Sequence, residues 1–200
     1  LQMPEYSNEK RGKPMMKKIL LSTVLASILL QTGAQASSEY NIAKGLAPVA
    51  QGQSISTLKP FYGDFRILGS KTYSSDEQAK FSPIDYAVSW WLFAEPEIAR
   101  RISVNQYDRY LNWRMDKVPV PEKQAMMMVS NMHIIPSSPA IAKEIKKVKR
   151  GDLVRLKGDL VEIKDKDLVW TSSLTPTDTG DGACEVFRVD SIQWIERVKS

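Results

Sequence analysis

Residues 151–189 constrain the fold of this chain most strongly, because they carry its clearest strand pattern. Over residues 153–164, leucine, isoleucine and valine are separated by charged residues, and residues 160–164 keep the two-residue period of a half-buried β-strand. Gly158 interrupts this pattern, and a glycine inside a strand indicates a bulge or a sharp bend. The pattern therefore predicts a sheet that curls.

More β-prone runs follow in the same region. Residues 165–167 predict a short polar turn, residues 168–171 a second strand, and residues 186–189 a third strand that residues 192–195 extend. Residues 175–182 are too polar and glycine-rich for a regular element and predict a loop. Consecutive antiparallel strands with a glycine bend indicate a curled meander or a small, partly open barrel.

Two serine–proline pairs predict the main helices. Ser82 and Ser138 are each followed by a proline, which places an N-cap residue directly before a first helical residue. Residues 84–92 and 139–150 then carry apolar side chains at the spacing of one helix face. Shorter segments predict strands over 65–73 and 102–113 and a helix over 122–129. We expect an α+β domain in which two main helices pack on a curled antiparallel sheet.

Residues 16–36 have the three-part layout of a secretory signal peptide. Two lysines precede an apolar run over residues 19–30, and Ala34 and Ala36 form a small-x-small cleavage site. The run is short for a bilayer span of about 20 residues, so we expect cleavage near Ala36 and no stable transmembrane span afterwards. We expect residues 1–15 to be a non-native or disordered extension, residues 37–59 a flexible leader, and residues 60–200 a single domain.

The charge of the mature chain disfavours nucleic acid as a partner. The full chain has a formal net charge of +5, and the loss of residues 1–36 removes five basic and two acidic residues, which leaves +2. Nucleic-acid binders typically carry a stronger basic excess. We therefore expect a periplasmic or secreted protein whose partner is an envelope protein or a small ligand.

One set of side chains has the composition of a catalytic site. Cys184 is the only cysteine and His133 the only histidine, and together with Asn131 they could supply a nucleophile, a base and a group that orients the base. Residues 180–182 form a glycine-rich turn that could expose the thiol and offer backbone N–H groups to an oxyanion. This set predicts, as an alternative, a cysteine-dependent hydrolase or transpeptidase.

The opposing interpretation of the same residues is structural, and we favour it. Glu185 places a carboxylate beside Cys184, which raises the pKa of a thiol instead of lowering it. Cys184 is then a small buried side chain and His133 a hydrogen-bonded one. The sequence has neither a cofactor motif nor a cluster of His, Cys and carboxylate side chains at metal-ligand spacing, so we expect no cofactor and no metal.

Five segments resemble a family of bacterial exported proteins. They are SPIDYAVSW (82–90), YLNWRM (110–115), SNMHIIP (130–136), KRGDLVRLKGDLVEI (149–163) and WTSSLTPTDTGDGACEV (170–186). The likeness covers about residues 61–190 and implies export, but no activity. The chain departs from the family pattern at Asp159, where a bulkier residue is expected, and at Pro176, where a basic one is expected. A separate likeness, through residues 151–163, is to periplasmic oligosaccharide-binding barrels, which implies an OB-like fold in the C-terminal half and no function.

The sequence thus favours a non-enzymatic binding or interaction module of the bacterial envelope. Its expected binding surface consists of aromatic and basic residues on expected strands, namely Trp170, Arg155, Tyr110 and Trp113.

Overall fold

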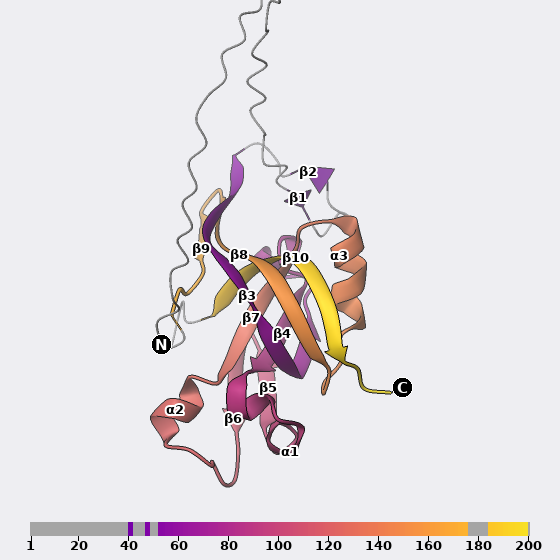
Figure 1. Ribbon diagram of the computed structural model, residues 1–200. Helices are drawn as coiled ribbons and strands as arrows, with labels where there is room; N and C mark the ends of the chain where they lie inside the picture. The colour runs from indigo at the N-terminus through magenta and orange to yellow at the C-terminus, as the bar shows by residue number, and fades with distance from the viewer. Residues whose placement is uncertain (1–39, 42–46, 49–51, 176–183, 200) are drawn as a thin grey trace, which may run out of the picture. The chain divides into compact units, whose positions relative to one another are not determined.

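The computed structural model describes residues 40–41, 47–48, 52–175 and 184–199, and Figure 1 draws the rest as a thin grey trace. The expected signal segment 16–36, the extension 1–15, residues 37–39, 42–46 and 49–51 of the leader 37–59, and most of the loop 175–182 lie outside the described residues. The long strand β3 (Gln53–Thr72) includes residues 53–59, which differs from the expected flexible leader.

The described part of the chain is mostly β-strand. Besides β3, its strands are β1 (Tyr40–Asn41), β2 (Ala47–Pro48), β4 (Ile84–Ser89), β5 (Ser103–Tyr107), β6 (Tyr110–Arg114), β7 (Val129–Pro136), β8 (Leu153–Asp165), β9 (Leu168–Thr171) and β10 (Glu185–Glu196). Its α-helices are α1 (Pro96–Ala99), α2 (Glu122–Met126) and α3 (Pro139–Glu144), and its 3₁₀ segments are η2 (Glu77–Lys80), η3 (Trp91–Ala94) and η4 (Ile145–Lys147).

Six strands form one curled, mixed sheet. Their order is β10-β7-β4-β3-β8-β9, and β10 also pairs with β8. The pairings therefore form a closed series, β10-β7-β4-β3-β8-β10. Most pairs are antiparallel, but β10 runs parallel to β7. The expectation of an antiparallel sheet is therefore only partly right, because strand pattern alone does not reveal which distant strand becomes a neighbour.

Gly158 of β8 lies very close to the backbone of the neighbouring strand β10. One of the two irregularities in the pairing of β10 with β8 lies in β10, between Val189 and Ser191, directly opposite Gly158 and Lys157. An added Cβ on Gly158 would lie 1.9 Å from the carbonyl oxygen of Arg188, so no other residue fits there without moving that backbone. The glycine permits a close approach of two strands, and the bulge at this position is on its partner.

The helix expected over residues 84–92 is wrong, because this segment is strand β4. All of Ile84–Ser89 is buried, between β3 on one side and β7 on the other. A strand that is covered on both faces shows no alternation, and a short apolar run fits the period of a helix as well as that of a buried strand. Ser82 and Pro83 thus precede a strand, and the chain turns into η3 only after Trp90.

The second serine–proline pair starts a helix as expected. The Ser138 hydroxyl accepts the backbone N–H of Ile141 at 3.2 Å, Pro139 is the first helical residue, and η4 continues α3 to Lys147. The short helix expected near residue 122 is α2. The described chain therefore has one of the two expected main helices, together with very short ones.

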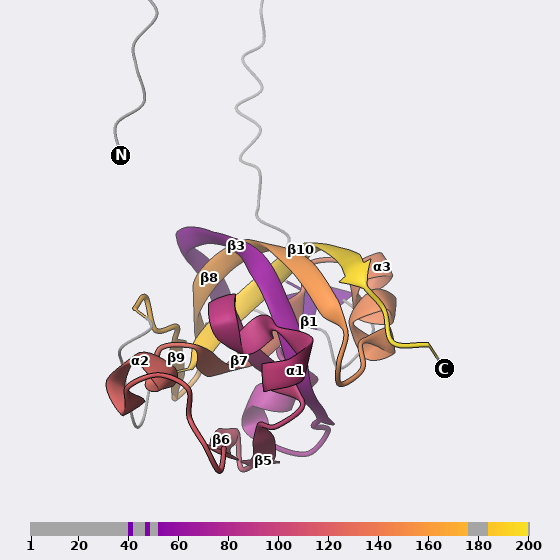
Figure 2. The ribbon, with the colours of Figure 1, turned by 60° about the horizontal axis from the view of Figure 1, so that its bottom comes forward.

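The core lies between the faces of the curled sheet. Its largest cluster includes Phe65, Tyr86 and Phe187, contributed by three different strands, and is covered by Ile145 beside α3. Figures 1 and 2 show α3 alongside β10, whereas β5, β6, α1 and α2 gather at another end of the sheet. There they build a separate apolar cluster around Phe93, Ile102 and Ala125.

Candidate functional site

A buried polar cluster lies between β4, β7 and the β5–β6 hairpin. Asp85 and His133 are directly paired residues of β4 and β7, and both are buried. Nδ1 of His133 lies 3.0 Å from Oδ1 of Asp85, a distance that suits an ion pair, although the angle is not that of a hydrogen bond. Arg109 donates from Nη1 to the same carboxylate oxygen at 2.7 Å.

Arg109 holds the tip of the β5–β6 hairpin against the sheet. It donates from Nη2 and Nε to the two oxygens of Asp76, at 2.7 and 3.2 Å. Its guanidinium carbon lies 3.7 Å from the ring centroid of Tyr73 and 6.0 Å from that of Trp170. Planar stacking combined with paired donors is a geometry that arginine provides and lysine does not. The hairpin is therefore fixed by a buried cation with two carboxylate partners.

Asn131 connects this cluster to Cys184. Its amide donates to the backbone oxygen of Arg109 at 2.9 Å, and its side-chain oxygen accepts from Gln106 at 2.9 Å. It also makes a side-chain hydrogen bond with Cys184, which directly precedes β10. The structure thus brings Asn131 to the thiol and His133 to Asp85, and no hydrogen bond joins Cys184 to His133 in the described part of the chain.

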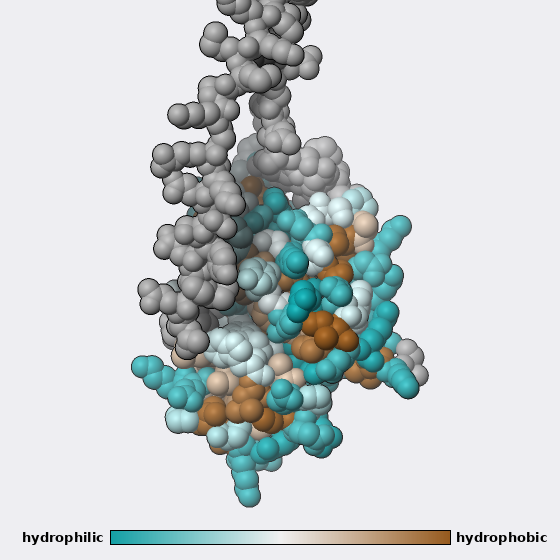
Figure 3. Space-filling view, viewed as in Figure 1, coloured by the Kyte–Doolittle hydropathy of each residue, from teal (hydrophilic) through white to brown (hydrophobic). Residues whose placement is uncertain are grey.

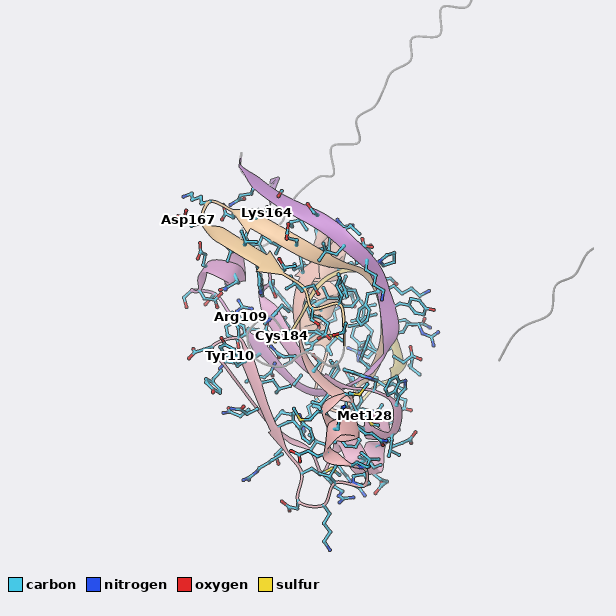
Figure 4. All side chains as sticks on the ribbon, turned by 90° about the vertical axis from the view of Figure 1, so that its left-hand side faces the viewer. Arg109, Tyr110, Met128, Lys164, Asp167 and Cys184 are labelled. Carbon is cyan, nitrogen blue, oxygen red and sulfur yellow. The ribbon has the colours of Figure 1, made fainter. Side chains whose placement is uncertain are left out.

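The surroundings of Cys184 disfavour its thiolate. Burial, followed by the negative charges of Glu185 and Asp85, raises the pKa of Cys184 from its ordinary value of 9.0 to about 12, and the hydrogen bond from Asn131 offsets this only in part. A cysteine nucleophile instead needs a depressed pKa or an adjacent base. In Figure 4, Cys184 is drawn among side chains within the domain, whereas Lys164 and Asp167 lie near the turn between β8 and β9.

Two cavities open beside this cluster and share Trp90 and Glu185 in their walls. The first, here called the β3 groove, has a volume of about 720 Å³. It is lined by residues 59 and 61–65 of β3, the segment after β4 (Trp90, Trp91, Ala94), residues of β8 (Leu153, Arg155, Lys157, Leu160), residues 173–175, and Glu185.

The second cavity, here called the hairpin groove, has a volume of about 870 Å³. Its walls come from the β5–β6 hairpin, α2 and the start of β7, and Asn131 and Cys184 lie in it. Tyr110, Trp113 and Met126 are among its lining residues. The face shown in Figure 3 carries brown, hydrophobic side chains over the region where Figure 1 labels α2 and β6.

The four residues of the expected binding surface lie in three different places. Tyr110 and Trp113 line the hairpin groove, and Arg155 lines the β3 groove, where it pairs with Asp64 through two contacts of 2.7 and 2.8 Å. That pair lowers the pKa of Asp64. Trp170 lines neither groove and instead packs on His133, with ring centroids 4.6 Å apart.

Sequence reasoning missed the residues that hold the cluster together, namely Asp85, Arg109, Asp76 and Gln106. One signal was present for Arg109, because Asp108 and Arg109 separate two aromatic strand-like runs by two residues, which is the length of a tight hairpin turn. Both residues have positive φ values of 45° and 70°, as such a turn requires. Nothing in the local sequence shows that this tip folds back onto Asp85.

The described residues hold no group of three or more His, Cys, Asp or Glu side chains arranged for a metal ion. Comparisons of the chain with protein-family models, curated proteins and solved structures each find no match.

Proposed function

We propose that this protein is an exported envelope protein, periplasmic or secreted, that acts as a non-enzymatic binding module. The observation that carries the proposal is the β3 groove, an open cavity with an apolar floor and large aromatic side chains in its wall. Tyr62 and Trp91 are 74% and 65% exposed beside it, which is unusual for side chains of their size. Cavities of several hundred cubic ångströms with mostly apolar walls are the usual form of a ligand site.

We propose further that β3, β4, β7, β8 and β10 form a small barrel of the OB type. The closed series of pairings, the parallel β7–β10 pair, and α3 between β7 and β8 support this interpretation. In such a barrel the tip of the β5–β6 hairpin lies against β4 and β7, where Arg109 fixes it. Binding is then expected beside that hairpin, in the grooves, and not on the strand face that the hairpin covers.

The alternative is a cysteine-dependent hydrolase or transpeptidase that uses Cys184, His133 and Asn131. The contact between Cys184 and Asn131 in the wall of the hairpin groove favours it. The raised pKa of the thiol weighs against it, because it leaves the nucleophile protonated at neutral pH. Among the described residues, no hydrogen bond joins Cys184 to His133 either. The binding module is therefore the better supported function.

Export rests on the sequence of residues 16–36. Among the described residues, no helix is both long and apolar enough to cross a membrane. Expression from Met16 with a C-terminal tag, followed by cell fractionation and mass spectrometry, tests the proposal. We expect a mature N-terminus near Ser37 in the periplasm or the medium, and an uncleaved chain in the cytosol would contradict export.

Binding is tested with 1-anilinonaphthalene-8-sulfonate (ANS), an anionic aromatic probe that fluoresces in apolar sites. We expect saturable binding of about one ANS molecule per native chain, weakened about thirtyfold by the double variant Tyr62→Ala/Trp91→Ala, since each ring contributes of the order of 1 kcal/mol. The matched control is Tyr107→Ala/Tyr110→Ala in the hairpin groove. Equal weakening by both pairs, or no saturable binding, would contradict the assignment of the site.

A further inference from the structure

Half of β3 has a sheet neighbour on one side only. Strand β8 pairs with β3 from Gln53 to Arg66, but β4 pairs with it only from Arg66 to Thr72. Among the described residues, β8 is thus the only strand that pairs with residues 56–65 of β3. Alternate residues of a strand point their N–H and C=O groups to opposite sides, so part of this backbone faces away from β8. This uncovered edge of β3 begins where its pairing with β4 ends, at Arg66 and Ser89.

The β3 groove runs along this edge. Residues 61–65 line it as an unbroken run, which is expected where a strand presents its edge and not one face. Trp90 and Trp91, which follow β4 directly, also line it. Phe61, Phe65 and Leu160 provide an apolar floor, and Gly63 leaves room for it, because an added Cβ there would lie 2.7 Å from Cζ of Phe65.

The rim of the groove has a basic excess. Lys59, Lys157 and Arg155 line it, and Arg155 is neutralised by Asp64. Glu185 lines it too, but this carboxylate is buried and accepts a hydrogen bond from Ser130. Lys59 and Lys157 are exposed and have no ion-pair partner among the described residues. A ligand that lies along β3 therefore meets two unpaired positive charges above an apolar floor.

The backbone next to the groove is held in an uncommon conformation. Trp91 has a φ of 51°, in the left-handed region that large side chains rarely adopt, and its ring is largely exposed. Such conformations cost of the order of 1–3 kcal/mol and persist at binding sites, where the surrounding structure enforces them. Here the conformation keeps a large aromatic ring beside the open edge of β3.

We propose that the β3 groove binds an extended peptide segment of a partner protein, which adds as a strand to residues 61–65, antiparallel to β3. The segment carries alternating apolar and acidic residues: the apolar side chains enter the floor, and the acidic ones meet Lys59 and Lys157. Main-chain hydrogen bonds to the edge hold the segment, and the alternate side chains select it. This inference rests on the proposed binding function and names the ligand class of the same site.

Blocked peptides of about seven residues test the inference, since that length matches the groove side of β3 at about 3.3 Å per residue. The first peptide alternates glutamate and valine, the second alternates lysine and valine, and the third is the glutamate–valine peptide with every backbone nitrogen methylated. Titration calorimetry gives the dissociation constants. We expect the first peptide to bind at least about tenfold more tightly than either control, because one control reverses the charge and the other lacks strand donors.

Reversal of the two lysine charges at the groove provides a second test. In Lys59→Glu/Lys157→Glu, we expect the glutamate–valine peptide to lose affinity and the lysine–valine peptide to gain it. The matched control, Lys143→Glu/Lys146→Glu, changes two exposed lysines near α3 that do not line the groove and should leave both affinities unchanged. Equal urea midpoints for the two variants would show that both proteins are folded.

The outcomes separate this inference from the function on which it rests. If the N-methylated peptide binds as well as its parent, or the two charge patterns bind equally, strand addition is wrong, whereas ANS binding in the groove still supports a binding module. If no peptide binds but ANS does, the inference is wrong, and the proposed binding function is still supported. If neither peptides nor ANS bind, both the inference and the proposed function fail.

Discussion

Nδ1 of His133 lies 3.0 Å from Oδ1 of Asp85, on directly paired residues of β7 and β4. The same carboxylate accepts a hydrogen bond from Arg109 at the tip of the β5–β6 hairpin. One fully buried charge therefore joins two sheet strands and the hairpin, and the cluster positions a wall of the hairpin groove. The single histidine of the chain thus contacts a carboxylate, and no hydrogen bond joins it to Cys184 among the described residues.

Replacement of Asp85 should destabilise the protein strongly. Asp85→Asn keeps the shape of the side chain but leaves Arg109 with one carboxylate partner fewer in a buried site. Loss of one partner from a buried ion pair typically costs about 3–5 kcal/mol, and we expect that decrease in the free energy of unfolding by urea titration. Asp64→Asn, which removes a carboxylate from the exposed pair with Arg155, is the control and should change stability little. Equal effects of the two variants would contradict a central role for the cluster.

The strand pattern of residues 153–171 was predictable, because β8 and β9 alternate where one face meets the core. The Ser138 cap was predictable for a similar reason, since a cap and a first-turn proline act within a few residues. Strand β4 was not, because it is buried on both faces and Asp85 within it is stabilised by partners far along the chain. The parallel pairing of β10 with β7 likewise depends on a contact between segments about 50 residues apart.

The site was less predictable than the fold. Asn131 and His133 lie on β7, and Cys184 directly precedes the neighbouring strand β10, so the three are close as a catalytic interpretation needs, but the choice of hydrogen-bond partners is a tertiary property. The β3 groove depends on where β4 stops pairing with β3, and no local pattern encodes that position.

Labelling of Cys184 should be slow at neutral pH. With a thiol pKa of about 12, the reactive thiolate is scarce in the native protein below that pH. We expect the iodoacetamide rate of native protein to keep rising above pH 9, while the rate of urea-unfolded protein levels off near that value. Rapid native labelling at pH 7 that saturates below pH 9 would instead favour the cysteine-dependent enzyme.

The same raised pKa predicts a pH dependence of stability. The folded state disfavours the thiolate, so this contribution to stability is complete below pH 9 and is lost as the pH rises toward 12. Cys184→Ser should remove that part of the alkaline decline when urea midpoints are compared between pH 8 and pH 11. Parallel midpoint curves for the two proteins would contradict a perturbed thiol.

Lys80 should determine part of the acid stability. Its ammonium group pairs with Asp165 at the end of β8, and this interaction, opposed by desolvation, lowers the pKa of Asp165 from 3.8. The contribution is present above pH 3.8 and is lost as the pH falls through the lower folded-state value. Lys80→Met should lower the urea midpoint at pH 7 and flatten its dependence on pH below 4. Lys147→Met, which breaks the exposed pair with Glu144, should leave that dependence unchanged.

Asp152 should hold the end of the C-terminal strand. Its carboxylate accepts the indole N–H of Trp194 at 3.0 Å and the backbone N–H groups of Lys149 and Val198 at 3.0 and 2.9 Å. Asp152→Asn replaces an oxygen acceptor and removes the charge, which we expect to cost about 1–3 kcal/mol. Hydrogen exchange should become faster at residues 194–198 and stay unchanged in β5 and β6. Unchanged exchange near Trp194 would show that the strand end is held by other contacts.

The central claim, that the protein binds through the β3 groove and not through its thiol, is tested most directly by NMR mapping of bound ANS. Amide shifts of ¹⁵N-labelled wild type and of Cys184→Ser would be followed during titration. We predict that both proteins show the same affinity and that the largest shifts fall at residues 61–65 and at Trp91. Shifts concentrated at Asn131, His133 and residue 184, or loss of binding in Cys184→Ser, would contradict the claim.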